Sequence, residues 1–332
     1  MKIYITMPKN ATSDSFLTPR TWELLRSIGE VYQNPYDHNL TADEVVAWAG
    51  DADVLITCWQ TCKYYKEDVL KMPNLKLIAH FAGSVAPVVD QSVYETGVRV
   101  ISGNDVFAKS VAEGCLCYTL AALRRLEHYM DVMRTGGFKE TVFYNRGLFG
   151  KKLGIVGFGA IARHYLNLVR WFDLEVLIYS SHLTDEEAAQ YGGRTASLEE
   201  IFSECDVISI HASNTPKTRG MITRELMERM KPDALLVNTA RGAVIDEPAM
   251  FEMLMDGKFY AALDVYAEEP PAPDAPIRQC KNALLMPHMG GPTMDMRAVV
   301  ALEVSKDIGR LSRGEALQYE ISAEAAARMT GG

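Results

Sequence analysis

The segment Gly150-Lys-Lys-Leu-Gly-Ile-Val-Gly-Phe-Gly-Ala-Ile-Ala162 carries the strongest local signal in the chain. Its apolar run Leu153–Val156 is long enough for one buried strand, and residues 163–172 have the pattern of a helix. A second apolar run, Leu174–Tyr179, predicts another strand immediately afterwards. Strand, glycine-rich turn, helix and strand in this order form the dinucleotide-binding pattern G-x-G-x-x-G/A.

Each small residue of the turn has a physical purpose in that pattern. Gly157 permits a tight turn, Gly159 lets the backbone approach a pyrophosphate, and Ala162 lets the helix lie close to the strand. The helix N-terminus then presents unpaired N–H groups and a partial positive charge to the phosphates. The alternative is a tight strand–helix turn without a ligand, which the same residues also permit.

The composition is that of a folded globular protein. Of its 332 residues, 48% are hydrophobic and 23% are charged, and this length favours two domains. The net charge of −9 argues against nucleic acid or an anionic membrane as the main partner. An anionic substrate is still compatible with it, because a nearby arginine outweighs a distant net charge.

The N-terminus and the cysteines bear on the cellular compartment. Met1–Pro8 has only a short apolar part, which suits a first strand better than a signal peptide, and no apolar run approaches the length of a membrane span. We therefore expect a cytoplasmic protein whose six cysteines are mostly buried thiols. Cys115 and Cys117 lie in a helical pattern without a second pair, so no zinc or other metal site is expected.

The first hundred residues alternate strand and helix signals. Two helices are predicted to begin at the Thr18-Pro19 cap and after the Thr41-x-x-Glu44 capping box. The predicted strands are Lys2–Met7, Glu30–Gln33, Ala52–Cys58, Leu75–Phe81 and Val98–Ser102. Strands that alternate with helices predict a parallel sheet covered on both faces.

The remaining chain repeats this alternation after a long helix predicted at about 108–133. Further strands are predicted at Val207–His211, Ala234–Thr239, Ala261–Val265 and Ala283–Met286, and helices at 223–230, 247–255 and, broken once, 293–313. The simplest arrangement is a substrate domain of residues 1–102 plus 293–332 and a dinucleotide-binding domain of residues 103–292.

Beyond the glycine-rich turn, four ordered motifs resemble one known family. They are Ser110-Val-Ala-Glu113, Val237-Asn-Thr-Ala-Arg-Gly-Ala-Val-Ile-Asp246, Ala261-Ala-Leu-Asp-Val-Tyr-Ala-Glu-Glu-Pro270 and Met286-Pro-His-Met-Gly-Gly-Pro-Thr293. Their order and spacing are similar to those of the D-isomer-specific 2-hydroxyacid dehydrogenase family. The resemblance implies an α/β protein of two doubly wound parallel-sheet domains, Rossmann-like or flavodoxin-like, with an active-site cleft between them. It also implies an NAD(P)-dependent oxidoreductase that interconverts a 2-ketoacid and a D-2-hydroxyacid.

The residues of these motifs indicate related chemistry when they are considered alone. Arg241, Glu269 and His288 each follow a predicted strand, and strand carboxyl ends of open α/β sheets face the ligand crevice. An arginine there offers a planar fork to a carboxylate. Each residue also has a plainer interpretation: a structural ion pair, a solvated charge and a structural histidine, respectively. Three such residues at the ends of three strands favour convergence on one point.

The resemblance assigns a role to each of the three. It implies that His288 is the general acid and base, that Glu269 orients it and favours its charged form, and that Arg241 binds the substrate carboxylate. Asp264 is implied to hold the nicotinamide carboxamide. The complete set of implied cofactor-binding residues is Gly157, Gly159, Ala160, Ile161, Ser180, Ser181, His211, Thr239, Ala240, Asp264 and Gly290.

The first domain is expected to complete the substrate site. The resemblance points to the loop Ala82-Gly83-Ser84, where free backbone N–H groups suit an anion. Trp59, in the turn Cys58–Thr61, either closes an apolar or flat pocket or packs in the core. That turn has no cation of its own, so a phosphorylated substrate is the less expected kind.

The choice between NAD and NADP depends on the end of the strand Leu174–Tyr179. Ser180 lies about 20 residues past the glycines, where an NAD enzyme usually carries Asp or Glu. Serine would not repel a 2′-phosphate, and Ser181 and His182 can donate hydrogen bonds to one. No arginine follows immediately, and NAD still fits, so the sequence favours NADP only slightly.

Two other functional classes compete with a dehydrogenase. A cofactor-sensing, corepressor-like binding protein on the same fold can retain the same residues. A methyltransferase with the glycine loop around an adenosyl ligand leaves Arg241, Glu269 and His288 unexplained. The resemblance further implies a homodimer formed through about 108–133, with a small-molecule substrate and neither nucleic acid nor membrane as partner. The identity of the 2-hydroxyacid stays open.

Overall fold

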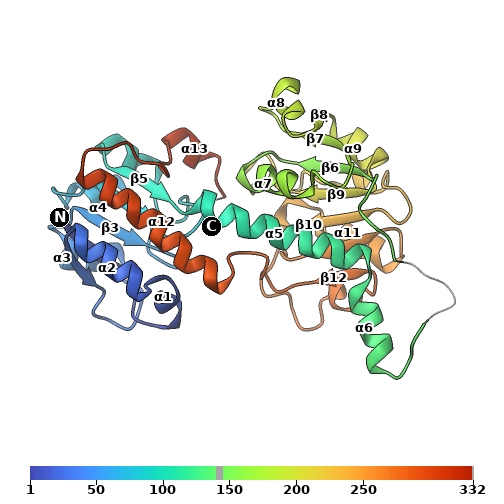
Figure 1. The fold of residues 1–332 in the computed structure, drawn as a ribbon, viewed down its shortest axis with the longest axis horizontal. Coiled ribbons are helices and arrows are strands. Elements are labelled where there is room, and N and C mark those ends of the chain that lie inside the picture. The colour runs from blue at the N-terminus through green and yellow to red at the C-terminus, as the bar shows by residue number, and fades with distance from the viewer. Residues whose placement is uncertain (140–144, 331–332) are drawn as a thin grey trace. The chain divides into compact units, whose positions relative to one another are not determined.

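The computed structural model describes residues 1–139 and 145–330 (Figure 1). The chain divides into two compact units, one of Met1–Ala108 with Pro292–Gly332 and one of Lys109–Gly291. The sequence analysis places the first boundary at 102/103 and the second at 292/293. Each unit has its own parallel sheet and its own buried core.

Unit 1 is built on a five-stranded parallel sheet with the strand order β2-β1-β3-β4-β5. Its strands are β1 Lys2–Ile5, β2 Glu30–Gln33, β3 Val54–Thr57, β4 Leu77–His80 and β5 Arg99–Ser102. All five strands were predicted from the sequence, within two residues at each end. This order is the flavodoxin-like one, and the direction of winding reverses between β1 and β3.

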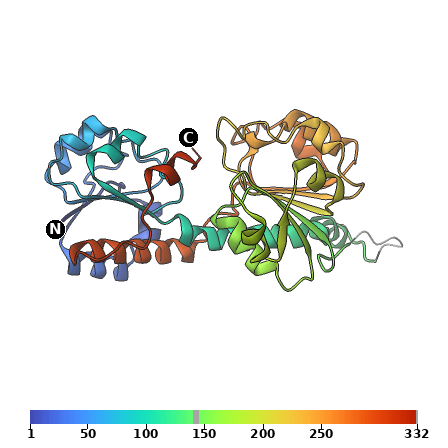
Figure 2. The same cartoon turned by 90° about the horizontal axis from the view of Figure 1, so that it is seen from above.

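Helices cover both faces of this sheet, as predicted. They are α1 Ala11–Phe16, α2 Pro19–Ile28, α3 Ala42–Ala49, α4 Lys66–Leu70, α12 Met294–Ser312 and α13 Ala323–Ala327. The hydroxyl of Thr18 accepts the N–H of Thr21, and Thr41 and Glu44 form the reciprocal capping box. The last long helix, α12, packs against α1 and α2 (Figures 1 and 2).

Helix α12 is continuous, so the predicted break within 293–313 is wrong. Gly309, within this helix, is buried, with Ile28 of α2 at van der Waals distance from the place of a β-carbon. The glycine therefore serves close helix packing rather than a helix end.

Unit 2 contains a seven-stranded parallel sheet with the order β12-β11-β10-β9-β6-β7-β8. Its strands are β6 Lys152–Val156, β7 Glu175–Tyr179, β8 Gly193–Thr195, β9 Val207–Ile210, β10 Leu235–Asn238, β11 Tyr260–Leu263 and β12 Ala283–Leu285. From β8 to β11 the order is the Rossmann order, with β12 added at the edge. The two doubly wound sheets confirm the predicted fold class. The short edge strand β8 was not predicted, because Gly193–Thr195 has no apolar run.

Several helix boundaries in unit 2 differ from the sequence prediction. The helices here are α5 Asn104–Leu123, α6 Leu126–Arg134, α7 Ala160–Val169, α8 Asp185–Ala189, α9 Leu198–Glu204, α10 Arg224–Met227 and α11 Glu247–Met255. The single helix predicted at 108–133 is interrupted, because Arg125 has a left-handed backbone with φ 51°. Helix α7 begins at Ala160, directly after Gly159, and not at Arg163.

Helix α5 is long and apolar enough to cross a membrane, with a mean hydropathy of 1.3 in its best window. The sequence analysis expects no such segment. Half of that window is buried inside the protein, where Ala112, Cys115 and Tyr118 pack in the core of unit 2. The core helix of a soluble protein meets the same criteria of length and composition, so α5 is only weak evidence for a membrane-spanning helix.

Candidate active site

The glycine-rich turn has the backbone that its sequence predicts. Gly157 has φ 94°, and a β-carbon there would lie 2.7 Å from the backbone nitrogen of Ala212, so only glycine fits. A β-carbon on Gly159, by contrast, would point into open space. Gly159 is the N-cap of α7 and provides no side-chain cap. The space beside Gly159 and the uncapped helix start are what a pyrophosphate requires.

A buried histidine next to this turn also fits a cofactor site. His211 follows β9, and its carbonyl carbon lies 2.8 Å from the place of a β-carbon on Gly157. Its Nε2 is 2.9 Å from the Ser209 hydroxyl, whereas its buried Nδ1 has no hydrogen-bond partner in the described chain. Burial lowers the pKa of His211 to about 4, so the ring is neutral at physiological pH. An unpaired buried nitrogen is a group that a ligand can satisfy.

Ser180 and Ser181 stand at the carboxyl end of β7. The Ser180 hydroxyl is half-buried and accepts the backbone N–H of His182 at 3.5 Å. The arginine of α7, Arg163, is held by Glu187 at 2.7 Å and lies over the ring of Phe158. These positions fit the ribose end of a dinucleotide, and no carboxylate of β7 lies there to prefer NAD.

The side chains of His288 and Glu269 are in contact. Nδ1 of His288 lies 2.6 Å from Oε2 of Glu269. Oε1 of Glu269 accepts the backbone N–H of Tyr266 at 3.0 Å, so both carboxylate oxygens are engaged. The His288 side chain is 48% exposed and that of Glu269 is 35% exposed. The pair is thus accessible to a substrate. The hydrogen bond from the Tyr266 backbone fixes the orientation of the Glu269 carboxylate.

Asp264 holds the loop that carries His288. Its two carboxylate oxygens accept the N–H groups of Met289 at 2.7 Å and Gly290 at 2.8 Å, and its carbonyl accepts that of His288 at 2.9 Å. His288 has a left-handed backbone with φ 56°, a conformation that needs such support. Burial raises the pKa of Asp264 and these two N–H bonds oppose the rise. Asp264 therefore positions His288, independently of the contact with the nicotinamide that the resemblance implies for Asp264.

Arg241 comes to the same edge of the sheet from β10. Its Nη1 donates to the carbonyl of Ala240 at 2.6 Å, and the Asn238 side chain donates to the Arg241 carbonyl at 3.0 Å. Burial lowers the pKa of Arg241 and the charge of Glu269 opposes that, so these two groups are electrostatic neighbours. Since β10, β11 and β12 are adjacent, the ends of three neighbouring strands carry Arg241, Glu269 and His288.

Two glycines, which sequence reasoning passed over, shape this edge. A β-carbon on Gly242 would collide with the backbone of Tyr266, so the loop of Arg241 lies directly against the loop that leads to Glu269. A β-carbon on Gly114, inside α5, would lie 2.9 Å from the carbonyl oxygen of Gly290. The position of Gly114 inside a predicted helix, away from its ends, was the sequence signal for this close approach of another backbone segment.

The predicted substrate loop of unit 1 has unpaired donors. No acceptor in residues 1–139 and 145–330 receives the backbone N–H groups of Gly83 and Ser84. The Ser102 hydroxyl donates to the carbonyl of Ala82 at 3.0 Å, and the Ser84 hydroxyl donates to that of Thr330 at 2.7 Å. The Ala82 carbonyl and the Ser84 hydroxyl thus already have hydrogen-bond partners. The N–H groups of Gly83 and Ser84 remain available to an anion.

Trp59 has features of both a pocket residue and a core residue. Its side chain is 39% exposed, and its ring also packs on those of Phe16 and Phe107 at centroid distances of 5.3 and 6.0 Å. The turn Cys58–Thr61 has no cation of its own, but a cation from α12 lies beside it. The guanidinium carbon of Arg297 lies 5.1 Å from the centre of the Trp59 ring.

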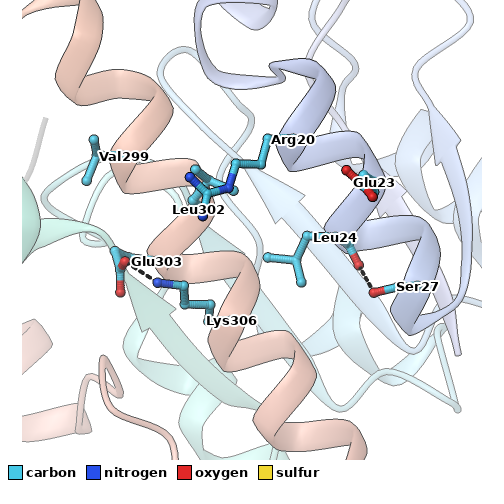
Figure 3. A pocket seen from close by; sticks show the side chains of 8 residues that line it. All are labelled: Arg20, Glu23, Leu24, Ser27, Val299, Leu302, Glu303 and Lys306. Carbon is cyan, nitrogen blue, oxygen red and sulfur yellow. Dashed lines mark hydrogen bonds and ion pairs between the residues drawn. The ribbon is translucent and has the colours of Figure 1, made fainter.

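A groove in unit 1 lies away from these predicted residues. Figure 3 shows it between α2 and α12, with the ion pair of Lys306 and Glu303 at 2.6 Å on one wall. Its other lining residues are Arg20, Glu23, Leu24, Ser27, Val299 and Leu302. None of the predicted site residues lines it. Across the described residues, no group of three or more His, Cys, Asp and Glu is placed to hold a metal ion.

Comparisons with known proteins agree with the motifs. Residues 116–290 match the family model described as "D-isomer specific 2-hydroxyacid dehydrogenase, NAD binding domain". The chain belongs to the D-isomer specific 2-hydroxyacid dehydrogenase family. The predicted resemblance is thereby confirmed, and unit 2 is the NAD-binding domain of this dehydrogenase family.

Curated relatives of the family differ in substrate and in length. A D-3-phosphoglycerate dehydrogenase of Methanocaldococcus jannaschii is 32% identical over 88% of this chain and 55% of its own length. A glyoxylate reductase of Thermococcus litoralis is 32% identical over 80% of this chain and 82% of its own length. The chain therefore spans about half the length of the phosphoglycerate dehydrogenases that it matches.

A solved glyoxylate reductase from Paecilomyes thermophila has the same fold. Its TM-score is 0.79, with 23% identity over 97% of this chain and 98% of that chain. This likeness covers both units. At 23% identity it supports the fold and says nothing about the substrate.

Proposed function

We propose that this chain reduces a 2-ketoacid to a D-2-hydroxyacid and catalyses the reverse oxidation. The observation that carries the proposal is the 2.6 Å contact between His288 and Glu269 at the sheet edge that also carries Arg241. A bound nicotinamide supplies the hydride to the carbonyl carbon in one direction and takes it up in the other. The chain itself must bind the acid, orient it and move one proton.

His288 moves that proton through Nε2. Because Nδ1 faces the Glu269 carboxylate at 2.6 Å, Nδ1 carries a hydrogen that it donates there. Nε2 is then the ring atom free to exchange a proton with the substrate oxygen. In reduction the protonated ring gives its Nε2 hydrogen to that oxygen, and in oxidation the neutral ring takes the hydroxyl proton back.

Arg241 binds the negative charge of the acid. Its half-buried guanidinium has one Nη occupied by the Ala240 carbonyl, which fixes the plane and leaves other donors of the fork for a carboxylate. A cation beside the carbonyl oxygen also stabilises the negative charge that develops there during hydride addition. We assign cofactor binding to the turn Gly157–Ile161 and to His211, whose free backbone and side-chain groups fit a dinucleotide.

The test is turnover of the purified full chain with a panel of 2-ketoacids, each with NADH and with NADPH. Consumption of reduced nicotinamide with at least one ketoacid, with the D-enantiomer as product, supports the proposal. Nicotinamide binding without turnover of any member refutes it and favours a cofactor-sensing binding protein. A His288→Gln variant must bind the dinucleotide normally and lose turnover.

We keep three further expectations as proposals. The absence of a carboxylate at Ser180 supports a slight preference for NADP. Exposed apolar side chains on α6, namely Leu126, Met130 and Met133, support a homodimer formed through α5 and α6. Light scattering of the purified protein tests the dimer, and cell fractionation tests the cytoplasmic location.

A further inference from the structure

A hydrogen-bonded line of buried side chains leads from helix α5 to the end of strand β9 in unit 2. Sγ of Cys115 lies 3.4 Å from the Ser209 hydroxyl, which lies 2.9 Å from Nε2 of His211. Cys115 and Ser209 are fully buried. The second ring nitrogen of His211, Nδ1, is buried and has no hydrogen-bond partner within residues 1–139 and 145–330. The hydrogen-bonded line therefore ends on an unsatisfied ring nitrogen.

A second buried group without a partner follows the neighbouring strand. Strands β9 and β10 are paired in register, so His211 and Thr239, which directly follow them, come next to each other. Thr239 is 7% exposed, and its hydroxyl makes no hydrogen bond in the described chain. Buried polar groups are nearly always paired in folded proteins. Two such groups at adjacent strand ends therefore indicate the place of a ligand.

The nearby hydroxyl groups of Thr119 and Tyr165 do not compete for Ser209. The Thr119 hydroxyl donates to the Cys115 carbonyl at 2.7 Å, which uses its hydrogen. The Tyr165 hydroxyl lies 3.2 Å from the Thr119 oxygen and therefore donates to it. The Ser209 hydroxyl is thus left with the thiol of Cys115 and the ring of His211.

The hydrogens of these three groups can be arranged in two orders. In the first, the thiol donates to the hydroxyl oxygen and the hydroxyl donates to Nε2 of His211. In the second, Nε2 donates to the hydroxyl, whose own hydrogen points to the sulfur. Sulfur is a weak acceptor and an imidazole nitrogen is a strong one, so the first order forms the stronger bond. Burial raises the pKa of the Cys115 thiol to about 11, so the sulfur carries a hydrogen at neutral pH.

The first order determines where the hydrogen of the His211 ring lies. Burial lowers the pKa of His211 to about 4, so the ring is neutral and carries one hydrogen. Because Nε2 accepts, that hydrogen is on Nδ1. A buried N–H without an acceptor is unfavourable for the folded chain, and a ligand oxygen would remove that cost. The backbone of His211 adjoins Gly157, in the turn that fits a pyrophosphate.

We propose that Cys115 and Ser209 hold His211 in the Nδ1–H form, so that His211 donates this hydrogen to a phosphate or ribose oxygen of the bound dinucleotide. The inference rests on the cofactor binding that the proposed function assigns to His211, and it does not require turnover of a ketoacid. Cys115 and Ser209 are positioning residues, since they act through the ring. A donor that is already set binds more tightly than a ring that must first change its tautomer.

The first measurement is ¹⁵N NMR of the full chain with labelled histidine, with and without the reduced nicotinamide dinucleotide that binds more tightly. The chain has seven histidines, and a His211→Gln variant identifies the signals of His211. In wild type, the His211 ring should be neutral with its hydrogen on Nδ1. The dinucleotide should shift the signal of that hydrogen downfield, because the hydrogen gains an acceptor. A hydrogen on Nε2, or no shift on binding, overturns the inference.

Variants of Ser209 and Cys115 separate positioning from packing. Ser209→Ala removes the hydroxyl, so the ring hydrogen should distribute over both nitrogens. The Kd of the dinucleotide should then rise about 3- to 10-fold, the range of one neutral hydrogen bond. Ser209→Thr and Cys115→Ser keep a donor and should resemble wild type, whereas Cys115→Ala should cause a smaller loss than Ser209→Ala. An unchanged ring and an unchanged Kd in Ser209→Ala overturn the inference.

Cys205→Ala is the matched control, because Cys205 is another fully buried thiol of unit 2 and is not part of the hydrogen-bonded line. It should lower the thermal midpoint about as much as Cys115→Ala does. The position of the His211 hydrogen and the Kd should stay as in wild type. A change of the His211 ring in Cys205→Ala as large as in Cys115→Ala would mean that core packing sets the tautomer, and it would overturn the inference.

Two fragments of the cofactor identify the acceptor. ADP contains the pyrophosphate and the adenosine, and ADP-ribose adds the second ribose. Weaker binding of ADP by Ser209→Ala assigns the acceptor to the shared part, and weaker binding of ADP-ribose alone assigns it to the second ribose. Unchanged affinity for both fragments overturns the inference. A ketoacid panel without any turnover would refute the proposed function and leave these binding results unaffected.

Discussion

Replacing Glu269 by glutamine changes the hydrogen bonds that fix the His288 ring without removing a side chain. In the native site, Oε1 accepts the Tyr266 N–H at 3.0 Å and Oε2 accepts from His288 Nδ1 at 2.6 Å. A glutamine amide accepts at one atom only. Because the Tyr266 N–H can only donate, the amide oxygen is expected to face it, which turns the NH2 group toward His288.

An NH2 group facing Nδ1 favours the wrong form of the ring. The neutral histidine would carry its hydrogen on Nε2 and could not take a proton from a hydroxyl group there. The protonated ring would place an Nδ1 hydrogen against the NH2 group and would lose its charged partner. Oxidation and reduction should therefore both slow.

The size of the effect follows from the bond and its exposure. A hydrogen bond to a charged group contributes about 1.5–3 kcal/mol. The side chains are 48% and 35% exposed, so solvent screening places this pair near the lower end of that range. We expect kcat to fall about 10- to 30-fold in Glu269→Gln. His288→Gln removes the proton donor itself and should cost about 10²- to 10⁴-fold.

The assay is kcat in both directions, with the best ketoacid of the panel, for each single variant and for the double variant. Since both residues serve one proton transfer, the double variant should be no slower than His288→Gln. A Glu269→Gln enzyme within threefold of wild type, or losses that multiply in the double variant, would refute this account of the pair.

Three further substitutions probe the cofactor site, the pH stability and the backbone. Ser180→Asp should depress kcat/KM for NADPH by charge repulsion and raise it for NADH, and a wild-type preference for NADH above about tenfold would contradict the lean toward NADP. Burial lowers the pKa of His80 to about 4. As the pH falls, the unfolded chain therefore takes up a proton at this residue before the folded chain does. The free energy of unfolding should consequently fall by about 3 kcal/mol between pH 6.5 and 4. Urea titrations across that range should show a flatter pH dependence in His80→Gln than in wild type. Gly242→Ala forces a β-carbon into the Tyr266 backbone and should lower the thermal midpoint and abolish turnover, whereas Gly147→Ala, with open space around its α-carbon, should do neither.

The sequence predicted the two sheets well because their signals are local. Buried parallel strands are short apolar runs, and Glu30–Gln33 was placed within its observed limits. Helix limits were less certain where a single backbone angle decides them. Nothing in the composition of residues 108–133 indicates that Arg125 adopts φ 51° and separates α5 from α6. Helix α12, by contrast, is continuous where a break was predicted, and its Gly309 is buried in the packing.

The site was predicted where motifs concentrate at strand ends. Arg241, Glu269 and His288 all follow strands, and adjacent strands bring their ends together. The supporting contacts were not predicted, because they join segments distant in sequence. Asp264 was assigned to the nicotinamide, yet its carboxylate holds the backbone of Met289 and Gly290. Only the three-dimensional structure shows that one residue can position the histidine.

Arg297 shows why contacts between distant segments are hard to infer from sequence. The turn Cys58–Thr61 contains no cation, and an arginine within a long amphipathic helix ordinarily indicates a solvated face. The charge reaches the turn only because α12 returns from the end of the chain to pack on unit 1 (Figure 1). A turn in such a fold can therefore lie beside a positive charge from a residue more than 200 positions away in the sequence.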